Sequence, residues 1–259
     1  MHGLEPPPLA TTEDPSSSRA LENERKVSES LIVDPSPTVS QAIATRRSIR
    51  QFLGRPVEES VVREILERAS RAASGGNLQP WKVSVLAGEV RDEFVRTVAE
   101  RMKETPFGEG PEYEIYPRDL ENPYRTRRGK VAGDMYALVG IERDDHAARA
   151  KQMALNFSFF GAPVGMFISI DRKMGPPQFA DLGIFLQNIM LLARERGLHT
   201  CPQEAWALWG KSIREFTGIP EEDLMFCGVA LGYADPDAAV NQLYSDRAPL
   251  EEFATFRGF

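Results

Sequence analysis

Cysteine and histidine are scarce in this chain of 259 residues. It has two cysteines, Cys201 and Cys227, with no Cys-x-x-Cys pair, and three scattered histidines. The cysteines provide no disulfide framework, and their small number suits a reducing compartment. Because no histidine lies at ligand spacing from a second histidine or a cysteine, we predict that the chain holds no metal.

Long apolar segments and an excess of positive charge are also absent. The longest apolar run, around Ile184–Ala193, is shorter than the roughly 20 residues that cross a bilayer, and the first residues lack the pattern of a secretion signal. The chain carries 31 lysines and arginines against 38 acidic residues, a net charge of −7, whereas duplex-binding proteins usually present a basic face. We therefore predict a cytoplasmic protein with no membrane and no nucleic-acid partner.

Residues 1–37 differ in composition from the rest of the chain. They hold six of the nineteen prolines, three successive serines and no aromatic residue, so this tract can bury little apolar surface. We predict a flexible N-terminal arm over residues 1–37 and a folded domain over residues 38–259. The arm is either disordered or crosses to a dimer partner.

Apolar residues at helical spacing and short apolar runs follow one another through the folded domain. They predict helices over residues 39–45, 58–73, 89–103, 146–160 and 177–196, and strands over residues 81–87, 164–170 and 225–231. The helix over residues 177–196 is apolar on nearly all sides, which predicts burial in the core or against a second subunit. Residues 104–133 are rich in proline, glycine, tyrosine and charge without periodicity, and we predict that they form a lid. These elements indicate an α+β or three-layer α/β architecture.

Three arginines and a serine lie within the five residues Arg46-Arg47-Ser48-Ile49-Arg50, here called the arginine segment. If this segment is extended after the preceding helix, Arg46, Ser48 and Arg50 project to the same side. Guanidinium groups suit phosphate and carboxylate oxygens, and each charge-assisted contact contributes roughly 1.5–3 kcal/mol. Taken alone, the segment would more simply be a solvated basic turn.

A second polar motif links a predicted helix to a predicted strand. In residues 73–81, here called the glycine loop, two glycines allow backbone amides to approach a flat ligand closely. Ser74, Asn77 and Gln79 add hydrogen-bond donors and acceptors. The alternative is a turn that merely joins the two elements.

Two further motifs follow: Cys201-Pro202-Gln203-Glu204-Ala205-Trp206, and a late segment around Arg247 that ends in Ala248-Pro249-Leu250. In this order and at these separations, the four motifs resemble those of the nitroreductase family of FMN enzymes. That family carries R-R-S-x-R, a P-S-x-x-N-x-Q-P-W loop, a G-L-x-T-x-P-x-E stretch and a late R-x-P-L. The match extends from about residue 38 to residue 250, with one departure at Ala73, where the family usually has proline.

The resemblance implies an α+β fold: a three-layer α-β-α sandwich with a central, mostly antiparallel sheet. It also implies an intertwined homodimer with two FMN sites at the subunit interface. The residues that it places at the cofactor are Arg46, Arg47, Ser48 and Arg50 at the phosphate and pyrimidine edge, Ser74, Gly75 and Asn77 from the other subunit, Pro202, Gln203 and Glu204 along the flavin ring, and Arg247 at the phosphate. A backbone amide near Gln203 to Ala205 would bond the flavin N5 atom.

The activity that the resemblance implies is the reduction of nitroaromatic compounds with NADPH or NADH. No Gly-x-Gly-x-x-Gly motif indicates a separate dinucleotide domain, so the nicotinamide and the acceptor would stack at the same place and the kinetics would be ping-pong. We nominate no catalytic side chain, because the cofactor itself carries this chemistry.

Aromatic and guanidinium groups interleave in the lid, which suits stacking on a flat ring and pairing with an anion. The candidate substrate or NAD(P)H residues are Tyr116, Tyr124, Arg125, Arg127 and Arg128. Their pattern looks like the nitrobenzoate and dinitroaniline branch of the family. One or more of the three arginines would bind the 2′-phosphate of NADPH or a substrate carboxylate; the alternative is a solvated lid face.

Several alternatives remain open at this point. The phenylalanines Phe157, Phe159 and Phe160 either fill the core, which we favour, or wall the flavin pocket, and Cys201 is more simply a packing residue than a redox-active thiol. A rival activity is reductive dehalogenation of halotyrosines, in which Glu112, Tyr116 and Lys130 would grip an amino acid. Flavin fragmentation and a non-catalytic flavin-binding role are further rivals.

Overall fold

A computed structural model describes residues 34–259 of the chain. The predicted N-terminal arm therefore lies almost wholly outside the described residues. Within residues 34–259, no helix is both long enough and apolar enough to cross a membrane.

Four strands form the central sheet, in the order β1-β2-β4-β3, and every neighbouring pair is antiparallel. Strands β1 (Lys82–Ala87), β2 (Val164–Asp171) and β4 (Asp223–Gly232) lie within two residues of their predicted positions. Strand β3 (His199–Gln203) was not predicted, because it is short and contains one proline and three polar residues. It forms by pairing along β4, with His199 opposite Gly232 and Gln203 opposite Gly228.

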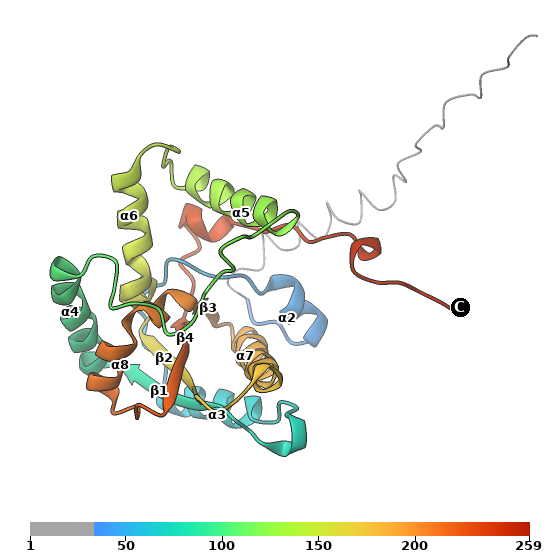
Figure 1. Cartoon of the computed structure of the whole chain (residues 1–259), viewed down its shortest axis with the longest axis horizontal. Coiled ribbons are helices and arrows are strands. Elements are labelled where there is room, and N and C mark those ends of the chain that lie inside the picture. Colours follow the sequence, from blue (N-terminus) through green and yellow to red (C-terminus); the bar gives the residue numbers. More distant parts are fainter. Residues whose placement is uncertain (1–33) are drawn as a thin grey trace, which may run out of the picture.

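Helices cover both faces of this sheet and give the molecule three layers (Figure 1). One face packs against α3 (Glu59–Ala69) and α7 (Pro176–Glu195), and the buried cluster there includes Val164, Met166, Ile168 and Ile170 of β2. Phe167 of the same strand points to the opposite face and joins a second cluster. This alternation follows from the two-residue period of a strand, and burial on both faces explains why β2 is apolar throughout.

The second cluster is formed largely by aromatic residues from helical segments. It joins α4 (Gly88–Glu104), the 3-10 segments Leu155–Gly161 and Glu204–Trp209, and α8 (Gly210–Thr217). Phe157, Phe159 and Phe160 are all buried in it, which confirms the prediction that they belong to the core. Residues 155–160 do not continue the predicted helix, since α6 (His146–Ala154) gives way to a backbone that is left-handed at Phe159 and Phe160.

The remaining helices are α2 (Val39–Thr45), which has the predicted bounds, and α5 (Tyr124–Leu138), which was not predicted. The lid is therefore irregular over residues 105–123 and helical from Tyr124 onward. Helix α5 has no buried residue, so it lacks the apolar periodicity by which a helix is found in a sequence.

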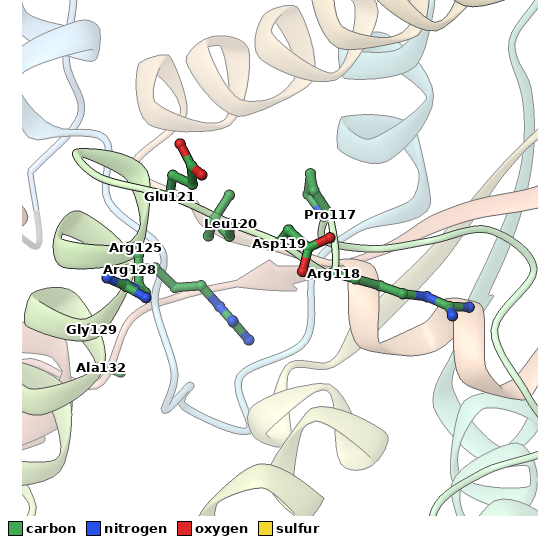
Figure 2. Close-up of a pocket in the computed structure, with 9 residues that line it drawn as sticks. All are labelled: Pro117, Arg118, Asp119, Leu120, Glu121, Arg125, Arg128, Gly129 and Ala132. Atoms are coloured by element: carbon green, nitrogen blue, oxygen red, sulfur yellow. The ribbon is translucent and has the colours of Figure 1, made fainter.

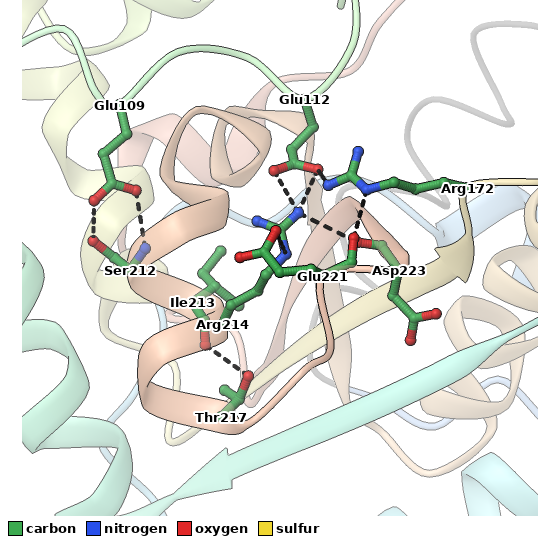
Figure 3. A network of polar contacts seen from close by, with 9 residues as sticks. All are labelled: Glu109, Glu112, Arg172, Ser212, Ile213, Arg214, Thr217, Glu221 and Asp223. Carbon is green, nitrogen blue, oxygen red and sulfur yellow. Dashed lines mark hydrogen bonds and ion pairs between the residues drawn. The ribbon is translucent and has the colours of Figure 1, made fainter.

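The start of the lid is fixed to α8 by Glu109. Helix α8 is preceded by Trp209, whose side chain makes no capping hydrogen bond. The carboxylate of Glu109 takes that role from outside the helix and accepts from the backbone nitrogen of Ser212 at 2.9 Å and from its hydroxyl (Figure 3). The backbone nitrogen of Glu109 also donates to the Leu208 carbonyl at 2.8 Å. An acceptor at an exposed helix start stabilises it by satisfying a free amide.

Glu112 anchors the lid more deeply. Both of its carboxylate oxygens accept from Arg214 of α8 at 2.6 Å, and one accepts from Arg172 at 2.6 Å (Figure 3). The side chains of Glu112 and Arg214 are 10% and 8% exposed, so this pair is largely withdrawn from water. Burial by itself would raise the pKa of Glu112, but the hydrogen bonds from Arg214 and Arg172 outweigh burial and lower it.

We expect Glu112→Ala to lower the free energy of unfolding by about 3 kcal/mol or more, because it leaves Arg214 buried without its carboxylate partner. The native pKa of Glu112 lies below the ordinary value of 4.5. Its stabilising contribution is therefore complete above that pH and is lost as the pH falls through the lowered native value. Urea unfolding at pH 7 and pH 4 measures both effects.

Glu114→Ala is the matched control, since Glu114 is also in the lid and pairs with Arg118. Those two side chains are 60% and 87% exposed, so the expected loss is below about 0.5 kcal/mol. Equal losses in the two variants would contradict a structural role for the Glu112 pair.

Candidate functional site

The arginine segment lies along the edge of the sheet, beside β3. Ser48 forms a parallel bridge with Thr200, and the backbone nitrogen of Ile49 donates to the Thr200 carbonyl at 3.1 Å. Arg46, Ser48 and Arg50 are partly exposed on one side, while Arg47 and Ile49 are buried on the other. The extended conformation and the shared side of Arg46, Ser48 and Arg50 agree with the prediction from the sequence.

Arg47 points away from the other two arginines, into the protein. Its guanidinium donates to the Asn241 carbonyl at 3.4 Å and lies 5.3 Å from the ring centre of Tyr244. The resemblance placed Arg47 with Arg46 and Arg50 at the cofactor, whereas the structure places its side chain behind the segment.

Cys201 of β3 lies under the exposed side of the arginine segment. The Ser48 side chain is hydrogen-bonded to the Cys201 sulfur. Burial raises the pKa of this thiol to about 11, although the positive charge of Arg50 acts to lower it. A neutral, buried thiol packs well and is a poor nucleophile, so the structure favours a packing role for Cys201.

The chain that follows β3 is held rigidly. The side-chain amide of Gln203 donates to the Asn156 carbonyl at 2.7 Å, and its oxygen accepts from the Trp206 ring nitrogen at 3.3 Å. Trp206 lies directly against Gly228 of β4, where a Cβ atom would overlap the indole ring. The side chain of Gln203 is therefore engaged inside the protein. These contacts fix the chain between Gln203 and Trp206 against β4.

Arg247 comes from the other end of the chain and approaches Arg46. Burial first, and then the charge of Arg247, lower the pKa of Arg46. Arg247 is oriented by donating to the carbonyl oxygen of Ser245 at 2.9 Å and to its hydroxyl at 2.8 Å. Within residues 34–259, no ion pair joins Arg46 or Arg247 to a carboxylate. Without a bound anion the two positive charges disfavour each other, and a doubly charged phosphate near both would be favoured.

The glycine loop lies elsewhere in the same chain. The backbone nitrogen of Gly75 donates to Asp181 at 3.3 Å, near the start of α7. Thr45, next to the arginine segment, accepts from Arg194 near the end of α7 at 3.2 Å. Asp181 and Arg194 are thirteen residues apart on this helix, which corresponds to about 20 Å. One chain therefore brings the first, third and fourth motifs together but leaves Ser74, Gly75 and Asn77 apart from them.

Tyr116 connects the lid to the residue after β3. Its side chain is near the carboxyl group of Glu204. Partial burial raises the pKa of Glu204, and Tyr116 acts in the opposite direction. The guanidinium of Arg128 lies 4.1 Å from the ring centre of Tyr116. Lid, tyrosine and Glu204 thus form one connected group.

The three lid arginines do not lie together. Arg125 and Arg128 line a hollow of about 630 Å³ between α5 and residues 117–121 (Figure 2). Arg127 forms an ion pair with Glu252 and lies near the ring of Tyr124, 6.0 Å from its centre. It lines a separate, smaller hollow beside Arg247.

The residues of the rival dehalogenase hypothesis are separated as well. Glu112 is committed to Arg214 and Arg172, and Lys130 forms ion pairs with Asp134 and Asp246. Both charged groups are thus engaged by other partners, so the geometry does not favour this activity.

Comparison with known proteins identifies the family. The sequence profile described as "Nitroreductase family" matches residues 43–233. The "Chloronitrobenzene nitroreductase" of Comamonas testosteroni is 39% identical over 221 residues, which cover 85% of this chain and 97% of that protein. The chain belongs to the nitroreductase family.

Other members of the nitroreductase family give the same result. The "4-nitrobenzoate reductase" of Pseudomonas putida is 38% identical, covering 84% of this chain and 94% of that protein. The crystal structure of the FMN and NADPH-dependent nitroreductase NfnB from sphigopyxis sp. strain HMH is 45% identical and superimposes with a TM-score of 0.83. It covers 86% of this chain and 100% of its own. The predicted nitroreductase fold is confirmed.

Asn241 is a structural residue of this site that sequence reasoning missed. Its side-chain oxygen accepts from the backbone nitrogen of Arg50 at 2.8 Å, and its side-chain nitrogen donates to the Gln51 carbonyl at 2.8 Å. It also donates to the Asp235 carbonyl at 2.9 Å. These bonds attach the arginine segment to the C-terminal part of the nitroreductase chain. A single asparagine in an irregular region carries no signal in the sequence that could have revealed this.

We expect Arg46→Ala and Arg247→Ala each to raise the Kd of FMN about tenfold or more, because each removes a charge-assisted contact to phosphate. Riboflavin has no phosphate, and its Kd is expected to change less than about twofold. Arg247→Ala also removes the repulsion on Arg46, so the free energy of unfolding without ligand does not fall. Flavin fluorescence titration and urea unfolding measure these quantities.

Arg96→Ala provides a control for the loss of one positive charge, because Arg96 is exposed on α4. Its affinity for FMN is expected to equal that of the unaltered chain. A uniform loss of riboflavin and FMN affinity in the Arg46 and Arg247 variants would show that these residues do not act on the phosphate.

Proposed function

We propose that this chain is an FMN-dependent oxidoreductase that reduces nitroaromatic compounds with NAD(P)H. The observation that carries the proposal is the arginine segment paired along β3 through Ser48 and Thr200, where the charge of Arg247 also acts on Arg46. It is supported by family membership and by the activities for which relatives are named. The structural relative is FMN and NADPH-dependent, and the two sequence relatives are named for chloronitrobenzene and 4-nitrobenzoate.

The residues present fit the phosphate and the ring of FMN. Arg46 and Arg247, with Ser48 and Arg50, would hold the phosphate and the polar edge of the ring. The backbone of residues 203–205 would supply an ordered amide to the ring, because Gln203 and Trp206 fix it to the sheet. When bound, FMN supplies the electron transfer between the nicotinamide and the nitro group. The protein binds and orients the reacting molecules and excludes water.

The donor and the acceptor would use one binding place in turn. The Gly-x-Gly-x-x-Gly motif, by which a separate dinucleotide domain binds phosphate, is absent from the sequence. The lid, through Tyr116 and Glu204, bounds the space beside the residues that follow β3. Mutual exclusion of the two ligands leads to ping-pong kinetics.

We also propose that the functional unit is a homodimer. The glycine loop lies about 20 Å along α7 from the arginine segment of its own chain, so Ser74, Gly75 and Asn77 would complete the site of a second copy. The outer face of α7 supports this arrangement. Ile184 on this largely apolar helix is 42% exposed, and a second copy could cover it. The two buried, free cysteines are consistent with a cytoplasmic location.

The purified protein is expected to be yellow, with one releasable FMN for each chain. With NADPH or NADH it should reduce chloronitrobenzene and 4-nitrobenzoate, and reciprocal plots at several donor concentrations should give parallel lines. Absorbance at the flavin and nicotinamide bands measures these outcomes. A colourless protein that does not take up FMN overturns the proposal. A yellow protein that dehalogenates iodotyrosine and leaves nitroaromatics unchanged supports the rival activity.

Complementation tests the shared site. Arg46→Ala and Asn77→Ala homodimers are each expected to bind FMN weakly, because every site lacks one residue. After unfolding, mixing and refolding, a mixed dimer has one site with both changes and one intact site. About half of the chains are mixed in this way at equal amounts, so roughly a quarter of the normal high-affinity FMN sites should return.

Refolding each variant alone is the control and should restore none of these sites. Absence of recovery in the mixture, with mixed dimers verified by mass spectrometry, would show that Arg46 and Asn77 do not serve one site across two chains.

A further inference from the structure

Arg125 and Arg128 lie together on one face of α5. They are three residues apart, which places them on neighbouring positions of a helical surface. Both line the hollow of about 630 Å³, and residues 117–121 of the lid form its opposite wall (Figure 2). Their side chains thus border one open hollow on the surface of the lid.

These two arginines differ from the other cations nearby. Arg127 pairs with Glu252, Lys130 pairs with Asp134 and Asp246, and Arg118 pairs with Glu114. Within residues 34–259, no ion pair is formed by Arg125 or Arg128, although Asp119 and Glu121 line the same hollow. Their guanidinium groups are therefore available to an anion that enters it.

The hollow lies close to the proposed cofactor site. Arg128 lies over the ring of Tyr116 at 4.1 Å, and Tyr116 in turn is near enough to Glu204 to act on the pKa of its carboxyl group. Glu204 directly follows the end of β3, where the rigid backbone begins. A ligand whose aromatic ring lies beside this backbone can extend past Tyr116 toward the two arginines.

We propose that Arg125 and Arg128 form a clamp for the anionic group, phosphate or carboxylate, of the ligand that reacts at the cofactor. The structure selects this pair from the three lid arginines and excludes Arg127, which Glu252 holds on another face of α5. Planar guanidiniums suit both kinds of oxygen anion. The inference rests on the proposed function, because it assigns part of a donor or acceptor to this hollow.

The anion has two sources, and both match the chemistry of the clamp. The first is the 2′-phosphate that distinguishes NADPH from NADH, and the second is the carboxylate that distinguishes 4-nitrobenzoate from nitrobenzene. A hollow of this volume accommodates either group. Each pair of compounds differs by the anion alone, so each pair reports on the clamp directly.

The test compares the Arg125→Ala, Arg128→Ala double variant with Arg127→Ala and the unaltered FMN-loaded protein. The double variant is expected to raise KM about tenfold or more for NADPH, for 4-nitrobenzoate or for both. The KM values for NADH and nitrobenzene should change less than about twofold, and kcat should be retained. Arg127→Ala removes a charge from the same helix and should leave both preferences unchanged.

Calorimetry gives a readout that does not depend on turnover. The probes are 2′,5′-ADP against 5′-AMP for the phosphate, and benzoate against benzamide for the carboxylate. We expect the double variant to weaken binding of the anionic member of at least one pair about tenfold. FMN content and the unfolding midpoint establish that each variant is folded and loaded.

Each result has one meaning. A change confined to the phosphate pair or to the carboxylate pair supports the clamp and identifies its source. Unchanged preferences in the double variant, or an equal change in Arg127→Ala, overturn the clamp while nitroaromatic turnover leaves the proposed function intact. If the unaltered protein takes up no FMN, the proposed function fails. In that case, 2′,5′-ADP that binds no tighter than 5′-AMP, together with benzoate that binds no tighter than benzamide, also overturns the clamp.

Discussion

The repulsion that Arg247 exerts on Arg46 is the constraint around which the proposed site is organised. Like charges are unfavourable at close range, and partial burial of Arg46 adds to this cost. A protein that nevertheless holds two such groups together must fix both through its fold. Arg46 is fixed by the segment that lies along β3, and Arg247 by its own loop. A phosphate bound by both, as proposed, would convert this repulsion into two favourable contacts and so link cofactor binding to the stability of the fold.

The rest of the framework keeps that arrangement in place. Asn241 attaches the arginine segment to the C-terminal part of the chain through three hydrogen bonds to backbone atoms. Trp206 packs against Gly228 and holds Gln203, so the backbone after β3 cannot shift without disturbing the aromatic cluster. Well-packed interiors resist small displacements, and this rigidity is what a site that orients a flat cofactor needs.

The lid combines a fixed start with a more open continuation. Glu109 and Glu112 attach its first part to α8 by buried carboxylates, and they leave that part little freedom. Beyond Tyr116 the contacts are ion pairs exposed to solvent, which contribute little to stability. The two faces of α5 differ accordingly. Arg127 and Lys130 pair with Glu252 and Asp246 of the C-terminal segment, which lies beside α5 (Figure 1), whereas Arg125 and Arg128 line the hollow.

The sequence by itself determined the family, three of the four strands, most of the helices and the side shared by Arg46, Ser48 and Arg50. These features follow from local periodicity and from short motifs, which act between residues close in the chain. Only the tertiary structure decided that Arg47 points inward, that β3 is a strand, and that Arg127 lies apart from Arg125 and Arg128. It also decided the roles of Asn241, Glu109 and Glu112. Each of these depends on a partner far away in sequence, such as β4, Glu252 or α8, and no local pattern encodes the position of such a partner.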